Sequence, residues 1–327
     1  MAESEPQEGY LERHGQEIAA AARRIAPYIR RTPTLETDLH PDLRLKPECF
    51  QVTGSFKARG AFNAVLALQQ RHPETEGVIA VSSGNHAQAL ALAARHAGFR
   101  AVILIPHDAN PAKVEATKAL GAEVIQDGVT FANREERLNE VMAERRLTLV
   151  HPFDDWDVVH GQATAAAELL SDAPELVQIA VPCGGGGLLS GTALAAKRTR
   201  ADVRVIGVEP VRADDAARTF SSGRLHTLEA APDTVADGVR PVSIGPKTLE
   251  VMVQRGLVDD MVTVSEAEIE NATRVAWFGL KLALEPTGAL PLAAWLAGRL
   301  GGSGPTGLVL SGGNANPEVV ARLLSSP

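Results

Sequence analysis

Lys57 has the setting of a reactive amine. It lies in the run Thr-Gly-Ser-Phe-Lys-Ala-Arg-Gly-Ala of residues 53–61, where small residues precede an amphipathic stretch at residues 59–69. The positive end of a helix dipole and the loss of water on burial both lower the pKa of a lysine at a helix start. A neutral amine reacts with carbonyl groups, so Lys57 is a candidate Schiff-base former. A solvated surface lysine is the alternative, because most lysines are exposed.

A loop of four glycines is suited to bind a phosphate group. It separates an apolar run (residues 176–181) from a helix-like stretch (residues 188–199) and consists of Gly184, Gly185, Gly186 and Gly187. Consecutive N–H groups can turn toward one anion, and the helix N-terminus adds partial positive charge. The loop lacks both the Gly-Lys-Ser/Thr ending of a nucleotide P-loop and the spacing of a dinucleotide site. The pattern therefore indicates a small phosphate monoester, with a simple tight turn as the alternative.

Two further polar loops follow strand-like runs. The loop Ser82-Ser83-Gly84-Asn85-His86 opens a helix-like stretch, and its hydroxyls and N–H groups can hold a carboxylate while the Asn85 amide bonds a phenolic oxygen. Ser311 follows the apolar run of residues 308–310 and offers one hydroxyl. All four motifs are expected at the carboxyl ends of strands, where open α/β sheets bind ligands.

With these motifs in this order, the sequence resembles the pyridoxal-phosphate (PLP) enzymes of fold type II, the tryptophan synthase β-like group, and within it the serine/threonine dehydratases and serine racemases. The resemblance covers roughly residues 25–314. It implies that Lys57 binds the cofactor's aldehyde, Phe56 lies against the cofactor and Asn85 bonds the ring hydroxyl. It implies that Ser311 faces the pyridine nitrogen. The residues implied to hold the phosphate are Gly184, Gly185, Gly186, Gly187 and Leu188.

The resemblance also implies a substrate site and a cation site. Substrate would contact Ser82, Ser83, Gly84, Asn85, His86 and Arg134. Arg134 precedes two glutamates, so a solvated helix face is its alternative. The segment of residues 209–215 looks like the family's cation site, in which the Glu209 and Asp215 carboxylates and the Ala213 carbonyl would bind Mg²⁺ or Ca²⁺. The alternative for this segment is a helix start that is rich in acidic residues and binds no cation.

Composition constrains the class of protein. The chain has 327 residues, enough for two domains, and 45% hydrophobic with 22% charged residues is typical of a globular enzyme. A net charge of -8 argues against nucleic-acid binding. The two cysteines, Cys49 and Cys183, lack metal-ligand spacing and fit a reducing compartment. Without a membrane-length apolar stretch or a secretory signal, we expect a cytoplasmic protein that binds no membrane and forms a homodimer or homotetramer.

Apolar runs alternate with helix-like stretches, which predicts an α/β fold with mainly parallel sheets. The predicted strands are residues 78–81, 101–105, 123–126, 147–150, 176–181, 203–208, 261–264 and 308–310. A break near residues 151–155 separates two groups of strands, so two doubly wound domains are expected. By the resemblance, residues 1–71 and 152–327 form a discontinuous large domain, residues 72–151 form the small one, and PLP lies in the cleft between them.

The expected reaction is PLP-dependent β-elimination of a 3-hydroxy amino acid to a 2-oxo acid and ammonia, with L-threonine or L-serine as the simplest substrate. A neutral Ser311 at the ring nitrogen favours a short-lived carbanion, and Phe153 and Pro241 stand where racemases tend to carry polar residues. Ser83 matches the position of the racemase acid, but dehydratases also have serine there. The alternatives are a serine racemase, a dehydratase of 3-hydroxyaspartate or of bulkier hydroxy amino acids, and a PLP-binding sensor without activity.

Overall fold

The larger of two sheets has five strands in the order β1-β9-β6-β7-β8, and every neighbouring pair is parallel. The computed structural model describes residues 5–107, 109 and 111–325. The strands of this sheet are β1 (Leu43–Pro47), β6 (Gln178–Pro182), β7 (Arg204–Pro210), β8 (Asp260–Val264) and β9 (Thr306–Leu310). Because β1 pairs with β9, an early and a late segment of the sequence lie side by side in one sheet.

Alternate residues of the central strand β6 face two different cores. Ile179 and Val181 pack with helices α6 and α7, whereas Ala180 belongs to the core on the opposite face, beneath α10 and α11. Strands buried on both faces are typical of parallel sheets. The helices of this part are α1 (Gln7–Ile25), α6 (Trp156–Asp172), α7 (Gly187–Thr199), α8 (Asp215–Ser222), α9 (Pro246–Leu249), α10 (Glu266–Arg274), α11 (Leu290–Leu296) and α12 (Pro317–Ser325).

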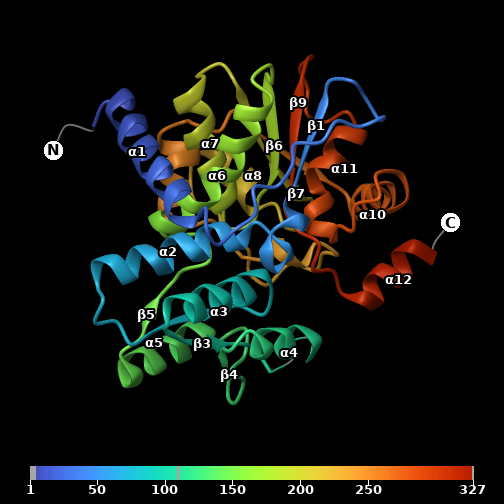
Figure 1. Cartoon of the computed structure of the whole chain (residues 1–327). Helices are drawn as coiled ribbons and strands as arrows, with labels where there is room; N and C mark the ends of the chain where they lie inside the picture. Colours follow the sequence, from blue (N-terminus) through green and yellow to red (C-terminus); the bar gives the residue numbers. More distant parts are fainter. Residues whose placement is uncertain (1–4, 108, 110, 326–327) are drawn as a thin grey trace.

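The smaller sheet has four parallel strands in the order β4-β3-β2-β5. They are β2 (Gly77–Val81), β3 (Arg100–Leu104), β4 (Glu123–Ile125) and β5 (Thr148–Leu149). The helices that accompany them are α3 (Asn85–Ala97), α4 (Pro111–Ala119) and α5 (Arg134–Arg145). Figure 1 shows this part at the lower end of the molecule, with the five-stranded sheet above it.

Helix α2 (Lys57–Arg71) contacts both parts, because it packs against α3 and against α6. The α2 and α6 backbones nearly touch: a Cβ atom on Gly161 would lie 2.5 Å from the Arg59 carbonyl oxygen. Glycine is therefore required at this crossing, and the start of α2 is held at the junction of the two parts. Short 3₁₀ and π turns complete the structure at Glu48–Phe50, Val52–Gly54, Asp237–Val239, Glu250–Gln254, Val275–Gly279 and Pro286–Ala289.

The predicted α/β class with parallel sheets is confirmed, and each predicted strand is present with ends displaced by a few residues at most. The domain limits at residues 72 and 151 stay a prediction. Across the described residues, helices long and apolar enough to cross a membrane are absent.

Candidate active site

Lys57 is the first residue of α2, and its amine points back across the junction. The Nζ atom donates a hydrogen bond to the Pro152 carbonyl oxygen at 2.8 Å and lies 5.1 Å from the centre of the Phe56 ring. Burial lowers the pKa of Lys57 to about 8, against the opposing effect of the Glu285 charge. An amine with this pKa has an appreciable neutral fraction near neutral pH and can act as a nucleophile or base.

Ser311 lies directly after β9, beside the start of α2. The Phe56 N–H donates to the Ser311 carbonyl oxygen at 3.0 Å, which joins the two segments. The Ser311 side chain is 1% exposed, and its hydroxyl has no hydrogen-bond partner among the residues that the structure describes. A buried hydroxyl without a partner costs free energy unless a ligand satisfies it, so Ser311 can bind a polar ligand atom. Its role at a ring nitrogen stays a prediction.

The four glycines connect β6 to α7, as predicted, and other segments pack tightly against them. A Cβ atom on Gly185 would lie 2.2 Å from the Phe153 ring, and Gly186 has a φ of 88°. The Thr248 hydroxyl donates to the Gly185 carbonyl oxygen at 2.9 Å, which fixes that oxygen away from the loop's N–H side. The loop therefore needs glycine, and it presents N–H groups at the N-terminus of a 13-residue helix.

Asn85 is the first residue of α3, and its amide is held at both ends. Its Nδ2 atom donates to Glu285 at 2.8 Å, and its Oδ1 atom accepts from Asn314 at 2.7 Å. Burial raises the pKa of Glu285 to about 7, and the negative charge of Asp237 adds to this effect. Glu285 was missed by the sequence analysis; an acid between an apolar pair and Pro-Thr-Gly was its only local signal.

The residues around the start of α3 combine an exposed hydroxyl with a buried imidazole. Ser83 is exposed, whereas His86 is 2% exposed and its Nε2 atom is 3.0 Å from the Val150 carbonyl oxygen. Burial lowers the pKa of His86 to about 3, so the ring is neutral and donates from Nε2. His86 thus anchors the loop and leaves Ser83 and the helix N–H groups accessible. The substrate roles of these residues stay a prediction.

Arg134 lies at the start of α5, apart from the contacts described above. Its guanidinium is 3.7 Å from the centre of the Phe131 ring and donates to the Phe131 carbonyl oxygen. It forms no salt bridge with any residue in the described part of the chain. Among the described residues, Arg134 forms no hydrogen bond or ion pair with Lys57, Asn85 or the glycine loop, and its role in binding substrate stays a prediction.

Glu209 and Asp215 form a buried acidic pair beside the glycine loop. Glu209, in β7, accepts from the backbone N–H groups of Ala216 and Ala217 at 3.3 and 2.9 Å. Burial raises the pKa of Asp215 to about 7, and one Asp215 oxygen has no partner among the described residues. Among all residues that the structure describes, no group of three or more His, Cys, Asp or Glu side chains is arranged to bind a metal. Carbonyl and water ligands would have to complete a cation site, so the metal stays a prediction.

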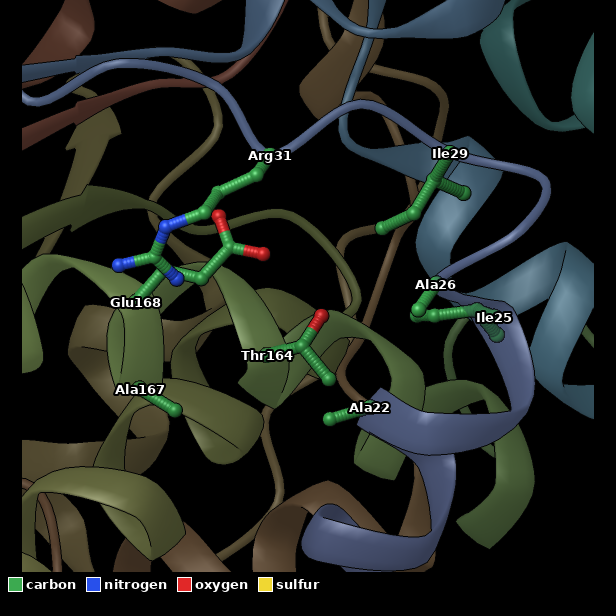
Figure 2. Close-up of a pocket in the computed structure, with 8 residues that line it drawn as sticks. All are labelled: Ala22, Ile25, Ala26, Ile29, Arg31, Thr164, Ala167 and Glu168. Carbon is green, nitrogen blue, oxygen red and sulfur yellow. The ribbon is translucent and has the colours of Figure 1, made fainter.

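A pocket of about 340 Å³ lies elsewhere, between the end of α1 and the side of α6. Figure 2 shows the residues that line it: Ala22, Ile25, Ala26, Ile29, Arg31, Thr164, Ala167 and Glu168. The Glu168 carboxylate accepts from Arg59 at 2.8 and 2.9 Å and from Lys46 at 2.7 Å. The charge of Glu168 is thus already paired, and Lys57 is not among the residues that line this pocket.

Comparison with known proteins identifies similar chains. A family model described as "Pyridoxal-phosphate dependent enzyme" matches residues 25–312. Serine racemase of Arabidopsis thaliana is 42% identical over 310 residues, covering 91% of this chain and 92% of the relative. L-threo-3-hydroxyaspartate ammonia-lyase of Pseudomonas sp is 39% identical over 317 residues, covering 94% and 97%.

Solved structures agree with these matches. A threonine deaminase from T.th. has a TM-score of 0.87 and 46% identity, covering 92% of this chain and 98% of that chain. Maize serine racemase has a TM-score of 0.88 and 38% identity, covering 94% and 95%.

Proposed function

The chain belongs to the pyridoxal-phosphate dependent enzymes, and we propose that it eliminates water from a 3-hydroxy amino acid, giving a 2-oxo acid and ammonia. L-Threonine or L-serine is the proposed substrate. The observation that carries elimination is the buried, unpartnered Ser311 hydroxyl, a neutral group where the ring nitrogen would lie. Relatives that are ammonia-lyases and a structural neighbour that is a threonine deaminase support this choice.

The residues present fit the cofactor. The N–H groups of residues 184–188 would hold its phosphate, Ser311 its ring nitrogen and Asn85 its phenolic oxygen, while Phe56 would lie against the ring. Lys57 would bind the aldehyde, since burial keeps a share of its amine neutral. When bound, the cofactor supplies an electron-withdrawing ring that makes the α-proton of the substrate acidic.

The protein's own groups would then position substrate and move protons. The N-terminus of α3, which begins at Asn85, offers N–H groups to the substrate carboxylate. The Lys57 amine would take the α-proton, and the hydrogen bond to Pro152 restricts where that amine can lie. The exposed Ser83 hydroxyl would act on the opposite face of the substrate.

Phe153 and Pro241 support elimination over racemisation. The Phe153 ring covers Gly185, and Pro241 Cδ would lie 3.4 Å from a Cβ atom on Gly184, so both residues pack against the proposed phosphate loop. Their apolar side chains offer no hydrogen-bond donor near the loop. Serine racemase is the second candidate function, because relatives of that name match most of this chain.

Three further assignments belong to this proposal. Mg²⁺ or Ca²⁺ would bind between Glu209, the Ala213 carbonyl and Asp215, because an unpartnered carboxylate oxygen is buried there. The protein would act as a homodimer or homotetramer in the cytoplasm. Its ligand would be a small amino acid, since a net charge of -8 disfavours nucleic acid.

Product analysis tests the proposal. With L-serine, pyruvate should form faster than D-serine, and with L-threonine the main product should be 2-oxobutanoate. Release of 2-oxo acid from serine, threonine and 3-hydroxyaspartate would rank the substrates. If D-serine formed faster than pyruvate, racemisation would be the main activity.

A further inference from the structure

Glu285 is buried directly behind the Asn85 amide. Its side chain is 2% exposed, and its N–H donates to the Gly312 carbonyl oxygen at 3.1 Å, beside Ser311. A Cβ atom on Gly312 would lie 2.8 Å from the Glu285 Oε1 atom. Because Gly312 has no side chain, the Glu285 carboxylate fits against the backbone there. The segment that carries the Ser311 hydroxyl therefore also positions Glu285.

The orientation of the Asn85 amide follows from a chain of hydrogen bonds that starts at a carbonyl group. The Thr53 carbonyl oxygen can only accept, so the Asn314 atom 2.6 Å away is the nitrogen Nδ2. The same Nδ2 atom is 2.7 Å from Asn85, which must present its oxygen. The Asn85 nitrogen consequently faces Glu285, which accepts at 2.8 Å. One N–H of Asn85 is used in this way, and the second has no partner among the described residues, so it can serve a ligand.

Charged groups from several elements face Glu285. Asp237, in the 3₁₀ turn Asp237–Val239, raises the Glu285 pKa, whereas Lys113 of α4 and Lys57 of α2 lower it. Lys113 and Asp237 also form an ion pair between the two parts of the molecule. In the other direction, Glu285 is the acid whose charge raises the pKa of Lys57 against the effect of burial. The charges of Glu285 and Lys57 thus affect each other's pKa. Ser311 is neutral and adds no charge to this pair.

We propose that Glu285 is a positioning residue for the cofactor: it holds the Asn85 amide toward the phenolic oxygen, and its negative charge favours a proton on the nitrogen through which Lys57 binds the cofactor. This inference rests on the proposed function. It gives the site a carboxylate that Ser311 does not supply, hydrogen-bonded to Asn85 and coupled to the charge of Lys57. Protonation of Glu285 would remove that charge without breaking the Asn85 contact, since a carboxylic acid still accepts from an amide.

The visible absorbance of the holoenzyme, titrated with pH, tests this inference. The absorbance of a Lys57-bound cofactor depends on whether the joining nitrogen carries a proton. In Glu285→Gln the neutral amide preserves the shape of the side chain but removes the charge. We expect the pH midpoint of the spectral change to fall by about one unit or more. Glu285→Asp keeps the negative charge, so its midpoint should lie close to that of the unaltered enzyme. Glu115→Gln, which replaces an exposed acid on α4, should leave the midpoint unchanged.

A second variant tests the charge effect without altering Glu285. Lys113→Met removes a cation that favours ionised Glu285, so the midpoint should fall by less than in Glu285→Gln, whereas Lys118→Met on the same helix should have no effect. If Glu285→Gln and Lys113→Met both titrate like the unaltered enzyme, Glu285 is only structural and the inference is wrong, even where thermal stability falls. Absence of any Lys57-dependent absorbance in the unaltered protein would instead overturn the proposed function.

Discussion

The Lys57 amine and the Pro152 carbonyl oxygen are joined by a hydrogen bond of 2.8 Å. Pro152 lies between β5 of the smaller sheet and α6 of the larger part, so the reactive amine is held by the connection between the two. His86 donates to the Val150 carbonyl oxygen two residues earlier in the same connection. The amine and the proposed substrate loop are therefore attached to one short segment, and a shift of this segment would move both.

Replacing Lys57 by alanine should abolish both the cofactor absorbance attached to the lysine and all turnover. The amine is the group placed to bond an aldehyde, while its removal leaves the α2 backbone and its core contacts in place. Absorbance spectra, 2-oxo acid release and thermal unfolding would be measured, with the exposed Lys118→Ala as the control. Turnover of threonine or serine by Lys57→Ala would refute the assignment.

Gly185→Ala should weaken cofactor binding by at least about tenfold, a loss of about 1.4 kcal/mol. The new methyl group would lie 2.2 Å from the Phe153 ring, so the loop or the ring must move and the N–H groups would lose their common direction. Cofactor affinity would be measured by titrating the apoenzyme with pyridoxal phosphate. Gly9 lies in α1, and a Cβ atom there would be 3.7 Å from its nearest neighbour, the Glu5 side chain. Gly9→Ala should therefore bind the cofactor as the unaltered protein does. If the two variants bind the cofactor with equal affinity, the glycine loop does not bind its phosphate.

The sequence was sufficient to predict the strands from β2 to β9 and the loops after them because those signals are local, whereas β1 (Leu43–Pro47) was not predicted. Apolar runs followed by glycine or polar residues identified the loops at Gly184 and Ser83 and the ends of β6 and β2. Glu285 could not be predicted in the same way, since its contact with Asn85 joins positions 200 residues apart. The only local signal at Glu285, an acid between an apolar pair and Pro-Thr-Gly, does not show that its carboxylate is buried beside Asn85.

The pairing of His14 with His160 was also invisible to sequence patterns. His14, on α1, lies 2.8 Å from His160 of α6 between their ring nitrogens, and both side chains are buried. The two positions are 146 residues apart and share no spacing that would mark them as partners. Their contact arises only when α1 packs onto α6, so local periodicity could not predict it.

These histidines predict a loss of stability in acid. Burial lowers the pKa of His14 to about 4 and that of His160 to about 3, both below the ordinary value of 6.5. The unfolded chain therefore binds more protons, so the stabilising contribution is complete above pH 6.5 and is lost progressively as the pH falls below it. Urea unfolding at about pH 7.5 and about pH 5.5 would show a lower free energy of unfolding at the acidic value, by up to about 1.4 kcal/mol per histidine and pH unit.

His14→Phe separates this pair from other acid effects. It preserves an aromatic ring between Tyr10 and Trp156 but leaves His160 without its partner, which should cost about 1–3 kcal/mol at neutral pH. The pH dependence should become shallower. His72→Gln, at an exposed position, should change neither quantity. An unchanged slope in His14→Phe would assign the acid sensitivity to other groups.

The proposed cation site predicts a stabilisation that depends on Glu209. A cation bound only by the folded state raises stability by about 2.7 kcal/mol at one hundred times its dissociation constant. Mg²⁺ or Ca²⁺ should therefore raise the unfolding temperature of the unaltered protein, and chelation should lower it. Glu209→Gln should abolish the response, whereas Glu229→Gln, an exposed acid, should retain it. If chelation changes neither stability nor activity, the protein does not bind Mg²⁺ or Ca²⁺ at this site.

Ser83→Ala should separate the two reactions that the site could support. Reprotonation of the substrate on the face opposite Lys57 requires a second acid, so loss of this hydroxyl should reduce D-serine formation by about 10²- to 10⁴-fold. Elimination should fall less, because the Lys57 amine still takes the α-proton from its own side. Pyruvate and D-serine would be measured from L-serine in parallel, with Ser221→Ala, an exposed serine at the end of α8, as the control. D-serine formation that survives unchanged in Ser83→Ala would show that the proton on the second face comes from another group, and Ser83 would then be left with at most a role in binding substrate.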